Sequence, residues 1–100
     1  MRVFELDRKN HLIADEQHSR RTVDHALFYP HEVINRALEM SPSALVVVHN
    51  HPSGDPTPST GYIALTRQLG DASKMMGLAL HDHIIITPNG EVSFRTEGLI

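Results

Sequence analysis

Two histidines, His49 and His51, are separated by one residue at the point where an apolar stretch gives way to a loop. If the apolar stretch is a strand, alternate side chains point to the same face, and the Cα atoms of the two histidines lie about 6.5–7 Å apart. Two imidazoles at that spacing can converge on one cation, with metal–nitrogen bonds of about 2.0–2.1 Å. The spacing therefore predicts a metal site, and two histidines that merely end a strand are the alternative.

The neighbouring elements determine where these histidines lie. Residues 44–48 form an apolar run without alternation, rich in valine, which predicts a strand covered on both faces at the centre of a layered α/β sheet. Ligands in such sheets gather at the carboxyl ends of strands, which is where the pair stands. The loop at 49–59 is dense in proline, glycine and serine, and Ser59 suits the N-cap of a helix.

Hydrophobic spacing predicts the remaining elements and an α/β fold class. Residues 2–6 alternate like a strand, and the chain returns antiparallel from 11–13 toward Glu16. Two helices follow, the first starting at Pro30 and the second ending at Gly77. Strands at 78–87 and 91–94 complete the order β-β-α-β-α-β-β, a mixed sheet flanked by two main helices. The helix faces predicted to be buried consist of Val33, Ile34, Ala37 and Leu38, and of Tyr62, Leu65, Leu69, Ala72 and Met76.

The composition excludes several classes of protein. The 100 residues are 40% hydrophobic and 21% charged, which is typical of one globular domain spanning 1–100. There are no cysteines for disulfides or thiolate sites, and a net charge of −3 excludes a strongly basic nucleic-acid-binding face as the main feature. No apolar run approaches the roughly 18–20 residues that span a bilayer, and residues 1–7 lack the apolar core of a signal peptide. We therefore expect no membrane contact and a cytoplasmic location.

The stretch 49–59, which reads His-Asn-His-Pro-Ser-Gly-Asp-Pro-Thr-Pro-Ser, closely resembles the signature of the RadC family. That family belongs to the JAB/MPN group, whose active members carry the JAMM metalloprotease motif. Residues 7–16, 29–33 and 80–86 are similar to the family as well, so the resemblance covers nearly the whole chain. It implies the cytidine-deaminase-like architecture of JAB/MPN domains.

The resemblance also implies roles for individual residues. His49 and His51 match the two histidine ligands of a catalytic zinc, and Ser59 matches the serine that polarises the substrate carbonyl. Glu16 best matches the glutamate that acts as general base on the zinc-bound water, with Glu5 and Glu32 left open. The implied reaction is hydrolysis of an amide or isopeptide bond in a protein or peptide substrate. Association with DNA is suggested only by the family's name.

One position departs from the family's pattern. The third zinc ligand is an aspartate three residues after the serine, and this chain has Tyr62 there. A phenol, with a pKa of about 10, is a poor zinc ligand, and catalytic zinc sites use three protein ligands. Three interpretations stay open: a metal-free domain, a replacement ligand at Asp55 or Asp82, or weak zinc binding through the two histidines and water. The alternative to an enzyme is therefore a catalytically inactive binding module.

A second histidine pair, His81 and His83, shares a face if its strand alternates. A second metal pair is one interpretation, and a polar strand end is another. In a third, a carboxylate such as Asp82 orients a ligand histidine. Met75 and Met76 are predicted to lie in the core, because methionine fills irregular gaps.

Overall fold

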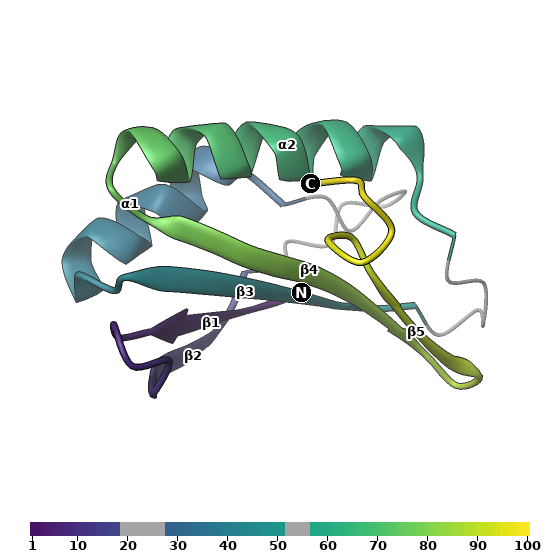
Figure 1. Cartoon of the computed structure of the whole chain (residues 1–100), viewed down its shortest axis with the longest axis horizontal. Coiled ribbons are helices and arrows are strands. Elements are labelled where there is room, and N and C mark those ends of the chain that lie inside the picture. Colours follow the sequence, from purple (N-terminus) through teal and green to yellow (C-terminus); the bar gives the residue numbers. More distant parts are fainter. Residues whose placement is uncertain (19–27, 52–56) are drawn as a thin grey trace.

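The computed structural model describes residues 1–18, 28–51 and 57–100. Over these residues five strands form one mixed sheet and two helices lie against it (Figure 1). The chain order β-β-α-β-α-β-β is confirmed, and the arrangement is consistent with the JAB/MPN fold. The elements are β1 (Arg2–Leu6), β2 (Leu12–Gln17), α1 (Pro30–Met40), β3 (Ala44–Asn50), α2 (Thr60–Met75), β4 (Ala79–Thr87) and β5 (Gly90–Ser93).

The sheet order is β2-β1-β3-β4-β5, which makes β3 the central strand. β1 runs antiparallel to both β2 and β3, and β5 runs antiparallel to β4. β3 and β4 are parallel, and the crossover between them contains α2. The carboxyl end of β3 and the first turn of α2 thus belong to one β-α-β unit. Figure 1 shows the carboxyl end of β3 and the start of α2 at the same end of the sheet.

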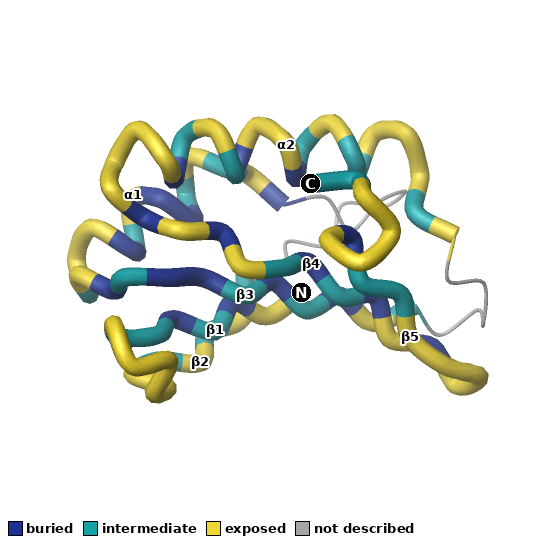
Figure 2. The backbone as a smooth tube through the Cα atoms, in the orientation of Figure 1, coloured by how far each residue is buried: buried dark blue, intermediate teal, exposed yellow. Residues whose placement is uncertain are grey.

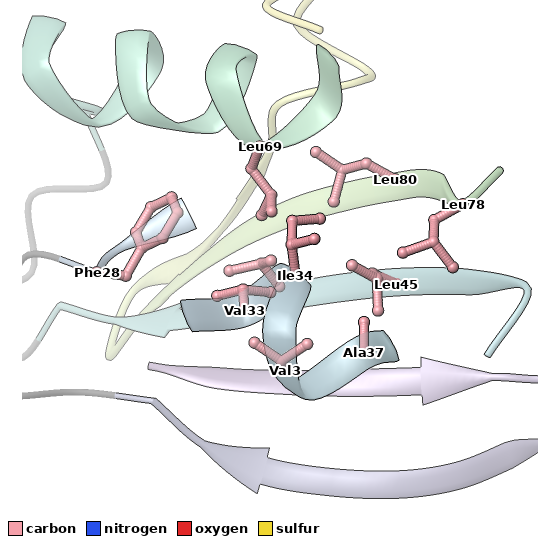
Figure 3. Packing of buried hydrophobic residues seen from close by; sticks show 10 residues of the cluster. Val3, Phe28, Val33, Ile34, Ala37, Leu45, Leu69, Leu78 and Leu80 are labelled. Atoms are coloured by element: carbon pink, nitrogen blue, oxygen red, sulfur yellow. The ribbon is translucent and has the colours of Figure 1, made fainter. Parts of the chain in front are cut away.

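Both helices cover the same face of the sheet, and their outer faces are exposed (Figure 2). The core lies between the helices and the strands (Figure 3). Val46 and Val48 point to the opposite face of the sheet and are only partly buried. The prediction that residues 44–48 are covered on both faces is therefore wrong, because β-branched side chains also favour a strand with one open face. The core side chains include Val3, Phe28, Val33, Ile34, Ala37, Leu45, Val47, Leu69, Leu78 and Leu80.

The helices begin and end where short-range signals predict. α1 begins at Pro30, whose fixed φ suits the first helical position and whose missing N–H leaves no donor unpaired. α2 is capped by Ser59, whose Oγ accepts a hydrogen bond from the backbone N–H of Tyr62 at 3.2 Å. Gly77 follows α2 with a φ of 76°, a left-handed conformation that glycine adopts without a steric penalty.

Three apolar residues predicted to be buried are exposed. Leu38 is 48% exposed, Met75 86% and Met76 49%. Leu38 lies beyond the buried stripe of α1, and Met76 is already the C-cap of α2. The buried face of α2 includes Thr66 and Ser73 beside its leucine. The buried face of α2 thus differs from the predicted one. It includes two hydroxyl residues, which a search for apolar spacing leaves out.

α1 has 11 residues and α2 has 16. Within the part of the chain that the structure describes, neither helix has the length and apolarity needed to cross a membrane.

Candidate metal site at the end of strand β3

The carboxyl end of β3 holds the two histidines that the sequence predicts to act together. His49 is 5% exposed, and its ring centroid lies 4.3 Å from that of His51. The backbone N–H of His51 donates to the carbonyl of Ile86 at 2.8 Å, so the pairing of β3 with β4 continues to this residue. Strand geometry therefore directs both rings to the face of the sheet that the helices cover.

Tyr62, from the first turn of α2, faces the pair. Its ring centroid lies 4.5 Å from that of His49 and 6.2 Å from that of His51. Burial raises the pKa of Tyr62 above its ordinary value, so its phenol is protonated at neutral pH. The position that carries a carboxylate in the family's pattern thus places a neutral aromatic ring against the histidines.

The imidazole of His49 is uncharged at neutral pH. Burial lowers the pKa of His49 to about 4, and the neighbouring His51 adds to this effect. Nδ1 of His49 is buried and has no hydrogen-bond partner among the residues that the structure describes. A neutral imidazole with a nitrogen that no protein group occupies is the form in which histidine binds a metal ion. The donor set at this end of β3 therefore fits a metal.

Ser59 stands at the N-terminus of α2, three residues before Tyr62, and is exposed. Because its Oγ accepts the hydrogen bond from the Tyr62 backbone, its own hydroxyl hydrogen is available to a second partner. Ser59 and Tyr62 share the helix start that follows the histidine loop. Of that loop, residues 52–56 lie outside the described part of the chain.

The side chain of Glu16 forms an ion pair with Arg36 of helix α1. Glu16 lies on β2, and its Oε2 accepts a hydrogen bond from Nε of Arg36 at 2.6 Å. This bond holds the pKa of Glu16 below its ordinary value, so the carboxylate is charged at neutral pH. The structure thus brings His49, His51 and Tyr62 together and engages Glu16 in a contact with Arg36. The role of Glu16 as a general base stays a prediction.

The other two candidate glutamates differ from each other in burial. Glu5 on β1 is 1% exposed, and burial together with the neighbouring Glu16 raises its pKa to about 7. Glu5 pairs in register with Leu45, which precedes His49 by four residues on β3. Glu32 lies partly buried in the first turn of α1.

Asp82, considered as a replacement ligand, is engaged by the C-terminal part of the chain. It accepts hydrogen bonds from the hydroxyl of Ser93 and from the backbone N–H groups of His83 and Arg95. In the sheet it pairs with Val46, whose side chain points away from the helices. Its contacts hold the segment after β5 against β4. Asp55, the other candidate replacement, lies outside the described residues.

A β-bulge separates the second pair of histidines. The register between β3 and β4 shifts between Leu45 and Val46, and His81 is the extra residue. The ring of His81 is exposed, with Nε2 3.0 Å from Oδ1 of Asn10, whereas His83 is fully buried. The prediction that His81 and His83 share a face is wrong, because the bulge breaks the alternation of the strand.

His83 instead lies close to the first pair, which the sequence alone did not indicate. Its ring centroid lies 6.1 Å from that of His49. The ring stacks on Phe94 at a centroid distance of 4.3 Å, and Nδ1 lies 2.7 Å from Oγ1 of Thr66. Burial lowers the pKa of His83 to about 3, so this imidazole is also uncharged at neutral pH. A buried hydroxyl and a third histidine, itself fully buried, thus belong to the surroundings of the site.

The fold and the histidine pair define a class of protein, the JAB domains. The model of the family described as "RadC-like JAB domain" matches residues 1–99, and this chain belongs to that family. Over 99 residues the chain is 60% identical to a UPF0758 protein of Rhodobacter capsulatus and 59% identical to one of Ruegeria pomeroyi. The aligned part is 99% of this chain but 46% and 44% of the two relatives, so the chain spans less than half of their length. The family resemblance predicted from residues 49–59 is confirmed.

Proposed function

We propose that this chain is a JAMM-type zinc hydrolase domain that cleaves an amide or isopeptide bond in a protein or peptide. The observation that carries the proposal is the contact between the buried, neutral ring of His49 and the ring of His51 at the carboxyl end of β3. Imidazole nitrogens are preferred zinc ligands in catalytic sites. Membership of the RadC-like JAB family supports the same site.

Each proposed residue has a distinct task. His49 and His51 would hold the metal, and zinc would supply a Lewis acid that polarises the carbonyl and activates water. Ser59 can donate its hydroxyl hydrogen to the oxygen that gains charge in the tetrahedral intermediate. Glu16 would accept the proton of the attacking water on Oε1 and then deliver it to the leaving amine nitrogen. Oε1 is the carboxylate oxygen that Arg36 does not bind.

A catalytically inactive binding module is the second candidate, and two observations favour it. The ring of Tyr62 packs against His49 at the position where the family's pattern has a carboxylate. Arg36 lowers the pKa of Glu16, and a carboxylate with a lowered pKa is a weaker base. Such a module would bind a protein partner. Association with DNA, suggested by the family's name, gains no independent support from a net charge of −3.

Metal analysis and a hydrolysis assay on three chains separate these candidates: the natural chain, Tyr62→Asp and Glu16→Gln. The hydrolase proposal predicts about one zinc per natural chain, and loss of hydrolysis without loss of zinc in Glu16→Gln. If only Tyr62→Asp holds zinc, the natural chain is the inactive module. A natural chain that holds zinc but cleaves neither peptide nor isopeptide substrates also rejects the hydrolase.

A further inference from the structure

We propose that Nε2 of His83 is the third protein ligand of the metal site formed by His49 and His51. The inference rests on the proposed function, because it concerns the ligand set of the same site. His83 comes from β4, the strand beside the histidine pair. A set of three histidines would thus stand in place of two histidines and the aspartate that Tyr62 replaces.

The hydrogen bonds of Thr66 determine which nitrogen of His83 carries the proton. Oγ1 of Thr66 donates its single hydrogen to the carbonyl of Tyr62 at 2.8 Å. The same oxygen lies 2.7 Å from Nδ1 of His83, where it can then only accept. Nδ1 therefore carries the proton, and Nε2 presents a lone pair. Metal-binding histidines are oriented in this way, with one nitrogen on the ion and the other donating to a protein oxygen.

Two buried imidazole nitrogens near the site have no hydrogen-bond partner within the described structure. His83 is fully buried, and its Nε2 has no hydrogen-bond partner among the described residues. Nδ1 of His49 is buried and unpartnered in the same part of the structure. Buried polar atoms in proteins are nearly always paired, so two orphaned nitrogens on neighbouring rings require an explanation. One cation between the rings would satisfy both.

The ring positions permit a shared ion after a small movement. Two imidazoles at a tetrahedral angle on one ion have ring centroids about 5 Å apart, given metal–nitrogen bonds of about 2.0–2.1 Å. The centroid distances of 4.3 Å for His49–His51 and 6.1 Å for His49–His83 lie on either side of that value. Among the described residues, no group of three or more His, Cys, Asp or Glu side chains is already arranged to hold a metal ion. We therefore expect the rings to shift by about one ångström when the ion binds.

The alternative is a histidine that only fills the core. Stacking on Phe94 and the hydrogen bond with Thr66 would hold the ring of His83 in either case. The two explanations differ at a single atom. If His83 is a ligand, its Nε2 lone pair binds zinc when zinc is present. If His83 only fills the core, adding zinc leaves Nε2 unchanged.

The first measurement uses the natural chain and so does not depend on the folding of a variant. Imidazole ¹⁵N chemical shifts are recorded before and after an equimolar amount of zinc is added. We expect the Nε2 resonance of His83 to move together with resonances of His49 and His51, while those of the exposed His81 stay in place. A change confined to His49 and His51 overturns the inference and leaves the proposed metal site intact. If no histidine responds, both are overturned.

The second measurement compares the zinc affinity of His83→Gln with that of the matched control His81→Gln. Glutamine can still bond Thr66, and circular dichroism reports whether the variant is folded. We expect zinc binding at least about tenfold weaker in His83→Gln and unchanged in His81→Gln. Unchanged affinity in a folded His83→Gln chain overturns the inference. If His83→Gln does not fold, the ¹⁵N measurement decides.

Discussion

Two polar clusters, each with a fully buried member, lie on the helix-covered face of the sheet, and their chemistry is opposite. The histidine cluster consists of His49, His51 and His83 at the end of the β3–β4 pair. The carboxylate cluster consists of Glu5 and Glu16 on β1 and β2, with Arg36 of α1. One cluster is built from imidazoles and the other from carboxyl groups paired with a guanidinium. Both come from strands of a single sheet.

The clusters differ in whether a positively charged side chain forms part of them. Arg36 binds Glu16 directly, and Glu5 keeps its proton up to a pKa of about 7. The rings of His49 and His83 contact aromatic rings and the hydroxyl of Thr66 in the described structure. Within the described residues the carboxylate cluster thus includes a cation, whereas the histidine cluster has two buried nitrogens, on His49 and His83, with no hydrogen-bond partner. This difference supports the proposal that a metal ion binds at the histidine cluster and not at the carboxylate cluster.

The largest expected effect follows from removing a donor from the histidine cluster. His51→Gln should weaken zinc binding at least about a hundredfold, because losing a ligand costs more than losing a partner that only orients one. Glu5→Gln removes a buried acid from the carboxylate cluster and should leave zinc affinity unchanged. Isothermal titration of both variants measures the contrast. Equal losses in the two variants would show that the clusters are not distinct.

The converse change removes the cation of the carboxylate cluster. Arg36→Met leaves Glu16 beside Glu5 without its positive partner, so two carboxyl groups face each other with no cation between them. Because both side chains are partly exposed, solvent screens the pair, and we expect only a modest loss in the free energy of unfolding. Urea denaturation of Arg36→Met and of Arg36→Met/Glu16→Gln measures the effect. The second substitution should restore much of the stability, and a double variant as unstable as the single one would contradict this account.

The two clusters should also respond to pH with opposite signs. The folded pKa of Glu5 is raised from 4.5 to about 7, so its contribution to stability is lost as pH rises through that window. The folded pKa of His83 is lowered from 6.5 to about 3, so stability is lost as pH falls through that window. Glu5→Gln should remove the first slope only and stabilise the chain above neutral pH by about 1–3 kcal/mol.

Urea unfolding with a chelator present, repeated between about pH 5 and about pH 8, tests this separation. Between about pH 5 and about pH 6.5 the two slopes oppose each other in the natural chain, so stability should rise more steeply with pH in Glu5→Gln than in the natural chain. A variant whose stability still decreases with rising pH as steeply as the natural chain would show that Glu5 does not cause the slope.

The elements and the first histidine pair could be predicted from the sequence because short-range patterns specify them. Pro30, Ser59 and Gly77 mark helix ends through their own backbone or side-chain chemistry. His49 and His51 need only the alternation of a strand to be brought together. These signals operate over a few residues and do not depend on what packs against them.

His83 could not be predicted because its orientation depends on the bulge in β4. If the register that pairs Leu45 with Leu80 continued unbroken, Asp82 would stand beside Val47 and face the helices. The extra residue His81 moves His83 into that place. Nothing in the local residue types marks the bulge.

The burial of Thr66 and of Glu5 escaped prediction for a related reason. Both are polar residues on faces that become buried only when α1, α2 and the sheet pack together. Apolar periodicity assigns polar residues to the outside, so it misses those that tertiary contacts bury.

The smallest expected effect tests whether Thr66 orients His83. Thr66→Val preserves the shape of the side chain but leaves Nδ1 of His83 without its acceptor. We expect a loss of about 1 kcal/mol in unfolding free energy and zinc binding weakened about tenfold. Ser73→Ala is the matched control on the same helix, because the hydroxyl of Ser73 is buried but has no hydrogen-bond partner among the described residues. It should change neither quantity by a comparable amount.

Thr66→Ser distinguishes orientation from packing, because serine restores the hydroxyl while omitting the methyl group. If the hydrogen bond to Nδ1 directs the lone pair of His83 Nε2 toward the ion, Thr66→Ser recovers zinc affinity even where it does not recover stability. If zinc affinity instead follows stability across Thr66→Val, Thr66→Ser and Ser73→Ala, the hydroxyl acts only through the fold. The carboxylate cluster is unaltered in all three chains, so the pH dependence assigned to Glu5 should persist in each of them.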